Sequence, residues 1–128
     1  MSSYQVVNFV SAISNAHNSL KYSFFCPRSK IILEVLKILK KEGYITHFQT
    51  QNDKESFKIF LKQGNGSEKS DRFKLMYKPS LKKYFSKKEV WKFSNNIGMF
   101  ILTTPFGILS DRDAKLLGTG GKVLLYVH

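Results

Sequence analysis

A glycine-rich polar stretch, QGNGSEKSD at residues 63–71, divides the chain into two parts with different hydrophobic patterns. The part before it shows helical and strand periodicity in the order α-β-α-β-β, whereas the part after it shows mainly strands with short helices. This mixed order is typical of an α+β fold and not of a doubly wound parallel sheet. We therefore predict two small lobes, residues 1–63 and residues 72–128, joined by a linker at residues 64–71.

The N-terminal part contains one strongly amphipathic segment, KIILEVLKILKKE at residues 30–42. Ser29 precedes it as a candidate N-cap, and Gly43 follows it as a candidate left-handed C-terminal residue. The predicted core face of this helix comprises Ile32, Val35, Leu36 and Leu39. The other predicted elements are a helix at 4–17 and strands at 21–27, 44–51 and 56–62.

Two capping boxes mark short helices in the C-terminal part. Ser86 with Glu89 opens one that runs through Trp91, and Ser110 with Asp113 opens another at residues 111–117. The predicted strands lie at 72–78, 98–104, 107–109 and 122–127, with a turn at residues 105–107.

The positive charge of the chain is concentrated in one segment. The formal net charge is +12, and residues 72–92 hold eight lysines and arginines but a single acid, with five aromatic residues interleaved. This pattern predicts an anionic partner. Nucleic acid fits better than a membrane surface, because Pro79 and strand-like alternation are unlike a basic amphipathic helix. No apolar run approaches the roughly 20 residues of a membrane helix.

The stretch LTTPFGILSD at residues 102–111 has no lysine or arginine, although the chain around it is strongly basic. It contains two adjacent threonines and a Pro-Phe-Gly corner. Contacts to phosphates supply affinity for nucleic acid, whereas rigid polar groups can supply specificity. We therefore expect residues 72–92 to give affinity and this turn to give specificity.

The sequence predicts no catalytic or metal site, no cofactor and no small-molecule substrate. The three histidines are far apart, and Cys26 is expected to be a small buried residue. Asp111 and Asp113 lie in the first turn of a predicted helix, where the helix dipole favours acids. The GTGG stretch at 118–121 is expected to be a helix C-cap followed by a turn. Two alternatives stay open: a small metal-dependent nucleic-acid-processing enzyme that uses the two aspartates, and a basic protein-interaction module.

Three stretches in the right order carry a resemblance to a known family: CPRSKIILEVLKILKKEGYI, KPSLKKY and LTTPFGILSDRDAKLLGTGGKVLLYV. They resemble the small-subunit ribosomal protein numbered eight in the bacterial scheme. That family has a Pro-x-Ser-Lys helix ending in Glu-Gly-Tyr-Ile, then Lys-Pro-Gly-x-Arg-x-Tyr, and finally Ser-Thr-Ser-x-Gly followed by Thr-Asp and Gly-Gly-Glu. The resemblance covers nearly the whole chain.

This resemblance implies two α+β lobes and direct binding to the central domain of small-subunit rRNA, mainly through the C-terminal lobe. It also implies neighbouring small-subunit ribosomal proteins as partners, a role in assembling the subunit and no membrane. Short hydroxyls and backbone amides at a stiff turn suit recognition of an A-form helix by its shape. The expected RNA-binding residues are Thr103, Thr104, Pro105, Phe106, Gly107, Tyr84, Lys82, Lys83, Lys87, Lys88, Gly120, Gly121, Lys122, Ser29 and Lys30.

Several positions depart from the family pattern. Pro105 replaces a serine, Lys122 replaces a glutamate, Ser80 replaces a glycine, and His128 replaces the last tryptophan. Of the 21 cationic residues 18 are lysine, a bias that an AT-rich genome would produce. Together these features predict a mitochondrial ribosome, and hence the mitochondrial matrix, with a plastid or the bacterial cytoplasm as alternatives.

Overall fold

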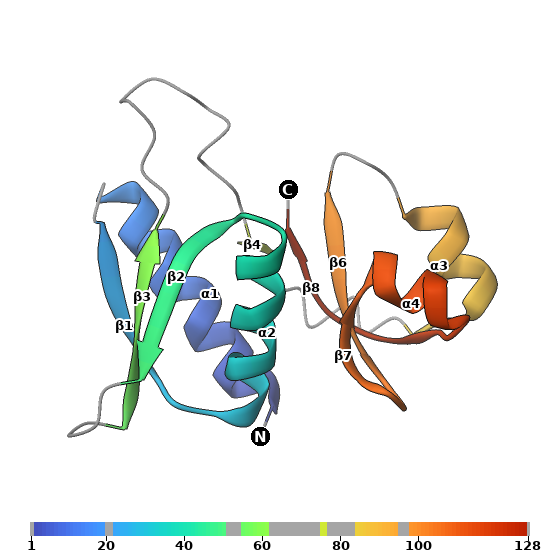
Figure 1. Cartoon of the computed structure of the whole chain (residues 1–128), viewed down its shortest axis with the longest axis horizontal. Coiled ribbons are helices and arrows are strands. Elements are labelled where there is room, and N and C mark those ends of the chain that lie inside the picture. Colours follow the sequence, from blue (N-terminus) through green and yellow to red (C-terminus); the bar gives the residue numbers. More distant parts are fainter. Residues whose placement is uncertain are drawn as a thin grey trace. The chain divides into compact units, whose positions relative to one another are not determined.

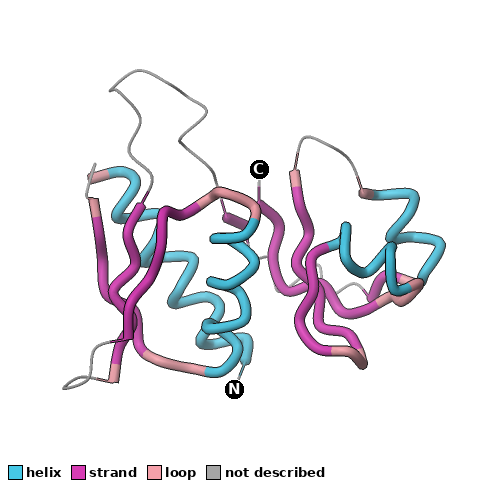
Figure 2. The backbone as a smooth tube through the Cα atoms, in the orientation of Figure 1, coloured by secondary structure: helices cyan, strands magenta, loops and turns pink. Residues whose placement is uncertain are grey.

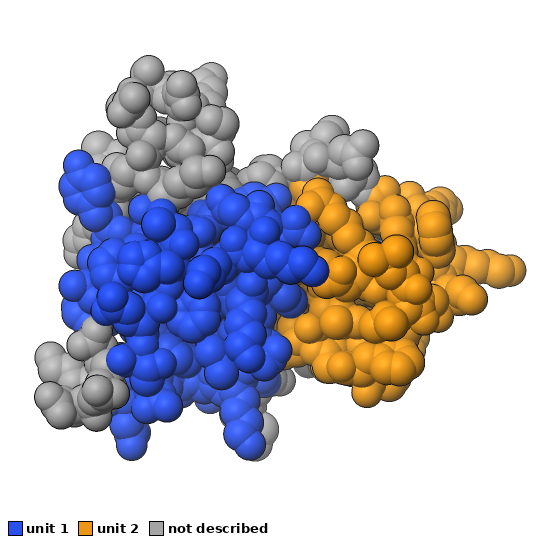
Figure 3. All heavy atoms as spheres, viewed as in Figure 1, with its two compact units in different colours: residues 1–74 blue, residues 75–128 orange. Residues whose placement is uncertain are grey.

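The computed structural model describes residues 2–19, 22–50, 55–61, 75–76, 84–94 and 98–127. The chain divides into two compact units, residues 1–74 and residues 75–128 (Figure 3). Each unit has its own antiparallel sheet and its own helices, so the predicted α+β class is confirmed. The proposed linker at 64–71 lies outside the described residues, and the lobe boundaries 1–63 and 72–128 therefore stay a prediction.

The N-terminal unit follows the predicted order α-β-α-β-β. Its elements are α1 (Ser2–Asn18), β1 (Ser23–Pro27), α2 (Lys30–Lys41), β2 (Ile45–Thr50) and β3 (Ser56–Leu61). The strands pair in the order β1-β3-β2, so β3 is the central strand. Both helices lie on the same side of this sheet (Figure 1).

Local signals explain why α2 forms where it does. The Ser29 hydroxyl accepts a hydrogen bond from the backbone N–H of Ile32 at 3.0 Å, which satisfies a donor that the first turn leaves free. Gly43 has φ +84, a conformation that glycine adopts without strain. The predicted core face is confirmed, because the helix buries Ile32, Val35, Leu36 and Leu39.

The C-terminal unit is built on its last strand. Its elements are β4 (Leu75–Met76), β5 (Tyr84–Phe85), α3 (Lys87–Phe93), β6 (Met99–Thr104), β7 (Gly107–Ser110), α4 (Asp111–Leu117) and β8 (Gly121–Val127). Strand β8 pairs with β4, β5 and β6, and β6 also pairs with β7 (Figure 2). One face of this sheet packs on the two helices through a core of Phe85, Val90, Leu102 and Ala114.

The structure differs from the sequence prediction at several boundaries. Strand β5 was not predicted, because its pairing partner lies in β8, far along the chain. Helix α3 continues two residues beyond Trp91 to Phe93, whose ring stacks on Phe85 at a centroid distance of 5.2 Å. Helix α1 begins at Ser2 and not at residue 4. Of the strand expected at 72–78, only Leu75 and Met76 are described, and no described helix is long and apolar enough to cross a membrane.

Candidate nucleic-acid interface

Three of the residues expected to bind RNA lie side by side on neighbouring strands of the C-terminal sheet. Lys122 in β8 is directly opposite Tyr84 in β5 and directly opposite Thr103 in β6. Directly opposed residues of antiparallel strands point to the same face of a sheet. Tyr84, Lys122 and Thr103 are all exposed, with Tyr84 at 65%. We call this set the cross-strand row.

The cross-strand row lies on the face opposite to α3 and α4. The neighbouring positions Phe85 and Leu102 point to the helix side, where they pack with Val90 and Ala114. The helices thus cover the apolar side of these strands and leave the aromatic, cationic and hydroxyl groups of the row in solvent. No single strand carries this combination, so pairing between strands creates the surface.

The hairpin between β6 and β7 extends the cross-strand row at one end. Thr104 is opposite Gly107, with Pro105 and Phe106 forming the two-residue turn, and Gly107 has φ +114. The turn presents Phe106, which is 65% exposed, and the neighbouring Pro105, which is exposed as well. The rigid corner expected from the sequence is therefore present, and its tip is apolar.

Thr104 and Thr103 have different surroundings although they are adjacent. Thr104 is 8% exposed, and its hydroxyl donates to the Gly107 carbonyl at 2.8 Å and accepts from the Phe106 N–H at 3.1 Å. The single hydroxyl proton of Thr104 is thus used inside the turn. Thr103 is exposed, so its hydroxyl is the one that the hairpin presents outward.

Gly120 and Gly121 are buried between strands. A Cβ atom on Gly120 would lie 2.9 Å from the Ser86 carbonyl carbon, and one on Gly121 would lie 2.9 Å from Thr104 Cγ2. Both positions therefore require glycine for close packing of the backbone. The packing keeps β5 and β6 close on the two sides of β8, which aligns the row. The expected contact of these glycines with RNA stays a prediction.

Two of the lysines expected to bind RNA occupy the first turn of α3. Ser86 accepts from the Glu89 N–H at 3.3 Å and Glu89 accepts from the Ser86 N–H at 3.1 Å, which is the predicted capping box. Lys87 and Lys88 follow this cap and are exposed. Cations at a helix N-terminus oppose the helix dipole, so these lysines do not serve the stability of α3. Lys82 and Lys83 lie outside the described residues.

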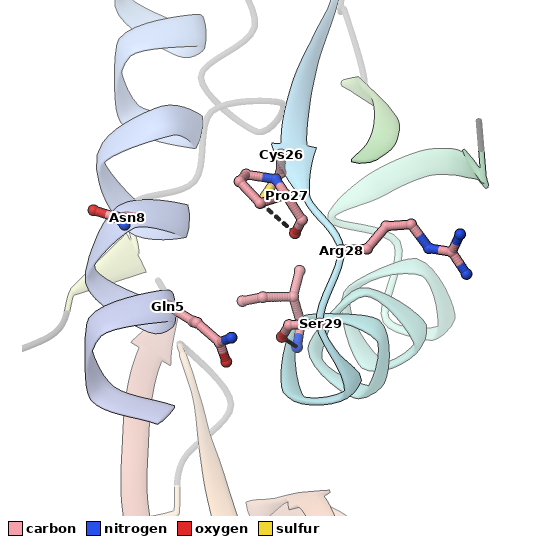
Figure 4. A pocket seen from close by; sticks show the side chains of 7 residues that line it. Gln5, Asn8, Cys26, Pro27, Arg28 and Ser29 are labelled. Carbon is pink, nitrogen blue, oxygen red and sulfur yellow. Dashed lines mark hydrogen bonds between the residues drawn. The ribbon is translucent and has the colours of Figure 1, made fainter. Parts of the chain in front are cut away.

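The two expected contact residues of the N-terminal unit lie at the start of α2. Ser29 uses its hydroxyl as the N-cap, and Lys30 is exposed. A cavity of about 240 Å³ lies beside them, between the start of α2 and the first turns of α1 (Figure 4). Its lining residues are Gln5, Asn8, Cys26, Pro27, Arg28, Ser29 and Ile32.

Cys26 behaves as the small buried residue that the sequence predicts. It is buried, and its thiol lies 3.6 Å from the carbonyl oxygen of Pro27. Burial raises the pKa of the Cys26 thiol to about 11, because the interior disfavours the charged thiolate. The thiol is therefore protonated at neutral pH and is a poor nucleophile.

The two aspartates of α4 are not equivalent. Asp111 is 1% exposed, and neither of its carboxylate oxygens has a hydrogen-bond partner within the described part of the chain. Burial raises the pKa of this carboxyl, and the nearby Phe100 backbone and Ser94 side chain offset only part of the effect. Asp113 is partly exposed, and its backbone N–H donates to the Ser110 hydroxyl at 3.2 Å. Both acids lie in the first turn of α4 as expected, but the burial of Asp111 was not predicted. Among the described residues, no three metal-ligating side chains come together.

Comparison with known proteins identifies relatives along nearly the whole chain. A family model described as ribosomal protein S8 matches residues 5–128. A protein of Coxiella burnetii is 36% identical over 124 residues, which cover 95% of each chain. A protein of Buchnera aphidicola is 33% identical over 123 residues, and one of Burkholderia multivorans is 34% identical over 124 residues, again with 95% of each chain covered. All three relatives are named small ribosomal subunit protein uS8.

Proposed function

This chain belongs to the ribosomal protein S8 family, and on that premise we propose that it is a structural constituent of the small ribosomal subunit that binds rRNA directly. The relatives are named as ribosomal proteins and not as enzymes, so the proposed role is structural. In finer terms, the RNA is the central domain of the small-subunit rRNA, which the protein helps to assemble. Its other partners are neighbouring small-subunit ribosomal proteins.

The cross-strand row is the observation that carries this proposal. Lys122 supplies a cation for a phosphate, Thr103 supplies a hydroxyl for a 2′-hydroxyl or base edge, and Tyr84 supplies a ring for a sugar or base. An A-form helix shows its 2′-hydroxyls across a wide, shallow minor groove, which a short row of mixed side chains can follow. The exposed hairpin tip with Phe106 fits a distorted site, where bases are unstacked.

The lysines and the hairpin residues have different roles in the proposed binding. Lys87, Lys88 and Lys122 attract the phosphates and make binding dependent on salt. Thr103 and the rigid turn discriminate between RNAs, because a hydroxyl that meets the wrong partner leaves a polar group unpaired. Of the two threonines expected to contact RNA, Thr103 therefore has the hydroxyl that suits this role, because the hydroxyl of Thr104 is bonded inside the turn.

We propose further that the ribosome is mitochondrial. The excess of lysine over arginine, 18 against 3, and the abundance of Phe support an AT-rich organelle genome. The relatives described above are bacterial, and the bacterial cytoplasm is the alternative location. Fractionation of the source cells, followed by detection of the protein in organellar or cytosolic ribosomes, distinguishes the two.

A salt titration tests the proposed RNA interface. Lys122→Ala removes a cation from the cross-strand row, whereas Lys40→Ala removes one from the exposed last turn of α2 and is the matched control. We expect Lys122→Ala to weaken binding to a small-subunit rRNA helix and to reduce the slope of log affinity against log salt by about one. We expect Lys40→Ala to change neither quantity. Equal effects of the two variants would refute the interface, and absence of the protein from salt-washed small subunits would refute the function.

A further inference from the structure

The sheet of the N-terminal unit has an outward face that its own helices do not cover. Positions alternate along each strand, and Phe24, Cys26, Phe57 and Ile59 point inward and are buried. The outward positions are Ser23, Phe25 and Pro27 in β1, Ser56, Lys58 and Phe60 in β3, and His47 and Gln49 in β2. Both helices lie on the other side of the sheet (Figure 1).

Aromatic rings and one cation occupy the middle of this face. Phe25 is directly opposite Lys58, and Phe60 is directly opposite His47. The rings of His47 and Phe60 are stacked, with centroids 4.1 Å apart and an interplanar angle of 14°. The Nζ atom of Lys58 lies 5.8 Å from the Phe25 centroid and 5.2 Å from the Phe60 centroid. We call these four residues the aromatic face.

The fold does not require this arrangement. The inward side chains of the same strands already supply the core, so an outward phenylalanine in mid-strand adds little to folding. Phe25 is nevertheless 55% exposed. An exposed ring next to the partly exposed rings of Phe60 and His47 offers a platform on which flat ligands can stack.

We propose that the aromatic face binds unpaired RNA nucleotides by stacking their bases on Phe25 and on the Phe60–His47 pair. Phe25 and Phe60 lie on adjacent strands two residues apart in register, a separation of roughly 7–8 Å that leaves each ring its own base. Lys58 lies between them, where the phosphate that links two splayed nucleotides would pass. Aromatic platforms with interleaved cations are the general means of binding single-stranded RNA.

Charge and polarity favour RNA over a protein partner. The outward positions of the three strands carry a lysine and no acidic residue. An apolar protein surface would bury Lys58 without a counter-charge, which is costly, whereas RNA brings the phosphate with it. At the edges of the face, Ser23 and Gln49 offer the donors and acceptors that base edges need.

This inference rests on the proposed RNA-binding function but concerns a different unit and a different form of RNA. The cross-strand row is expected to recognise a structured helix, and the aromatic face is expected to bind nucleotides that are not base-paired. The same set of measurements can therefore refute the proposal for the aromatic face without refuting the proposal for the cross-strand row, or the reverse.

The test uses the full chain, a fluorescent oligouridine of about eight nucleotides, and the rRNA helix as a second probe. Phe25→Ala removes one stacking ring at a mostly exposed position. Tyr22→Ala is the control, because Tyr22 is a 72% exposed aromatic of the same unit that lies outside the aromatic face. We expect Phe25→Ala to weaken oligouridine binding about 5- to 150-fold, the equivalent of about 1–3 kcal/mol for one stacked base. Tyr22→Ala is expected to leave that affinity unchanged, and Phe25→Trp to restore it.

Two results would overturn the inference. The first is an unchanged oligouridine affinity in Phe25→Ala. If this variant binds oligouridine normally but dissociates from the ribosomal subunit more readily, a protein and not RNA covers the face. The second is an equal loss in Tyr22→Ala, which would show binding by charge and aromatic content alone. Failure of the wild-type protein to bind the rRNA helix would instead count against the proposed function. A photo-crosslink from 4-thiouridine RNA to Phe25 or Phe60 gives independent support.

Discussion

The two adjacent threonines of the β6–β7 hairpin allow the same substitution to separate turn stability from RNA recognition. Thr104→Val removes a hydroxyl that makes two hydrogen bonds, to the Gly107 carbonyl at 2.8 Å and from the Phe106 N–H at 3.1 Å. A net contribution of about 0.5–1.5 kcal/mol for each bond gives an expected loss of about 1–2 kcal/mol, because Gly107 and Phe106 are exposed and water can replace part of the interaction. Thr103→Val removes an exposed hydroxyl, and its effect on stability is expected to stay within about 0.5 kcal/mol.

Urea unfolding followed by tryptophan fluorescence measures the first effect. Trp91 is the only tryptophan of the chain and lies in α3 of the same unit, so its signal reports the unfolding of the sheet that carries the hairpin. With a slope of about 2 kcal/mol per molar urea, the Thr104→Val midpoint should fall by about 0.5–1 M. Binding assays measure the second effect, and Thr103→Val should weaken binding to the rRNA helix by about 1–3 kcal/mol but leave an unrelated duplex unaffected. If both variants lose stability equally, or if Thr103→Val weakens both RNAs alike, the assignment of the two hydroxyls is wrong.

Three further variants test packing, burial and core. Gly120→Ala should destabilise the C-terminal unit by about 1–3 kcal/mol because its Cβ meets the backbone at Ser86, and urea unfolding that shows no loss would contradict that close approach. The raised pKa of Asp111 means that the wild type loses stability as the pH rises from about 4, so Asp111→Asn should be at least as stable as the wild type at pH 7. In unfolding measurements at several pH values, this difference in stability should disappear below about pH 4. A variant less stable than the wild type at pH 7 would show that the charge of Asp111 is favourable. Leu36→Ala, at a fully buried position of α2, should cost about 2–5 kcal/mol by thermal or urea unfolding, and a cost below about 1 kcal/mol would place that face in solvent.

The elements that the sequence predicted well are those that local residues specify. Helix α2 has an apolar face at helical spacing, a serine at its start and a glycine with positive φ after its end, all within fifteen residues. The capping box at Ser86 and the N-cap at Ser110 likewise lie within single turns, and both helices begin where these residues predict. In each case the signal and the structure it determines are a few residues apart.

The features that the sequence did not predict depend on pairing between distant segments. Strand β5 forms only because Tyr84 and Phe85 reach Lys122 and Gly121, and the cross-strand row exists only in that register. The burial of Asp111 arises from the packing of α4 on the sheet, which no local pattern reports. The outward aromatic face had a signal: in the adjacent pair Phe24-Phe25 of one strand, alternation requires one ring to point outward.

The organising role of β8 has a consequence for synthesis. This strand follows all the other described strands, yet it holds Lys122 and provides the pairing edge for β4, β5 and β6. A growing chain that has reached β7 can already complete the N-terminal sheet, whose strands all lie before residue 62. Such a chain lacks β8, the strand that pairs with both Tyr84 and Thr103 and brings them together. The surface proposed for the rRNA helix therefore becomes available only after residue 127 has been added, so a truncated product cannot occupy that site with a half-formed interface.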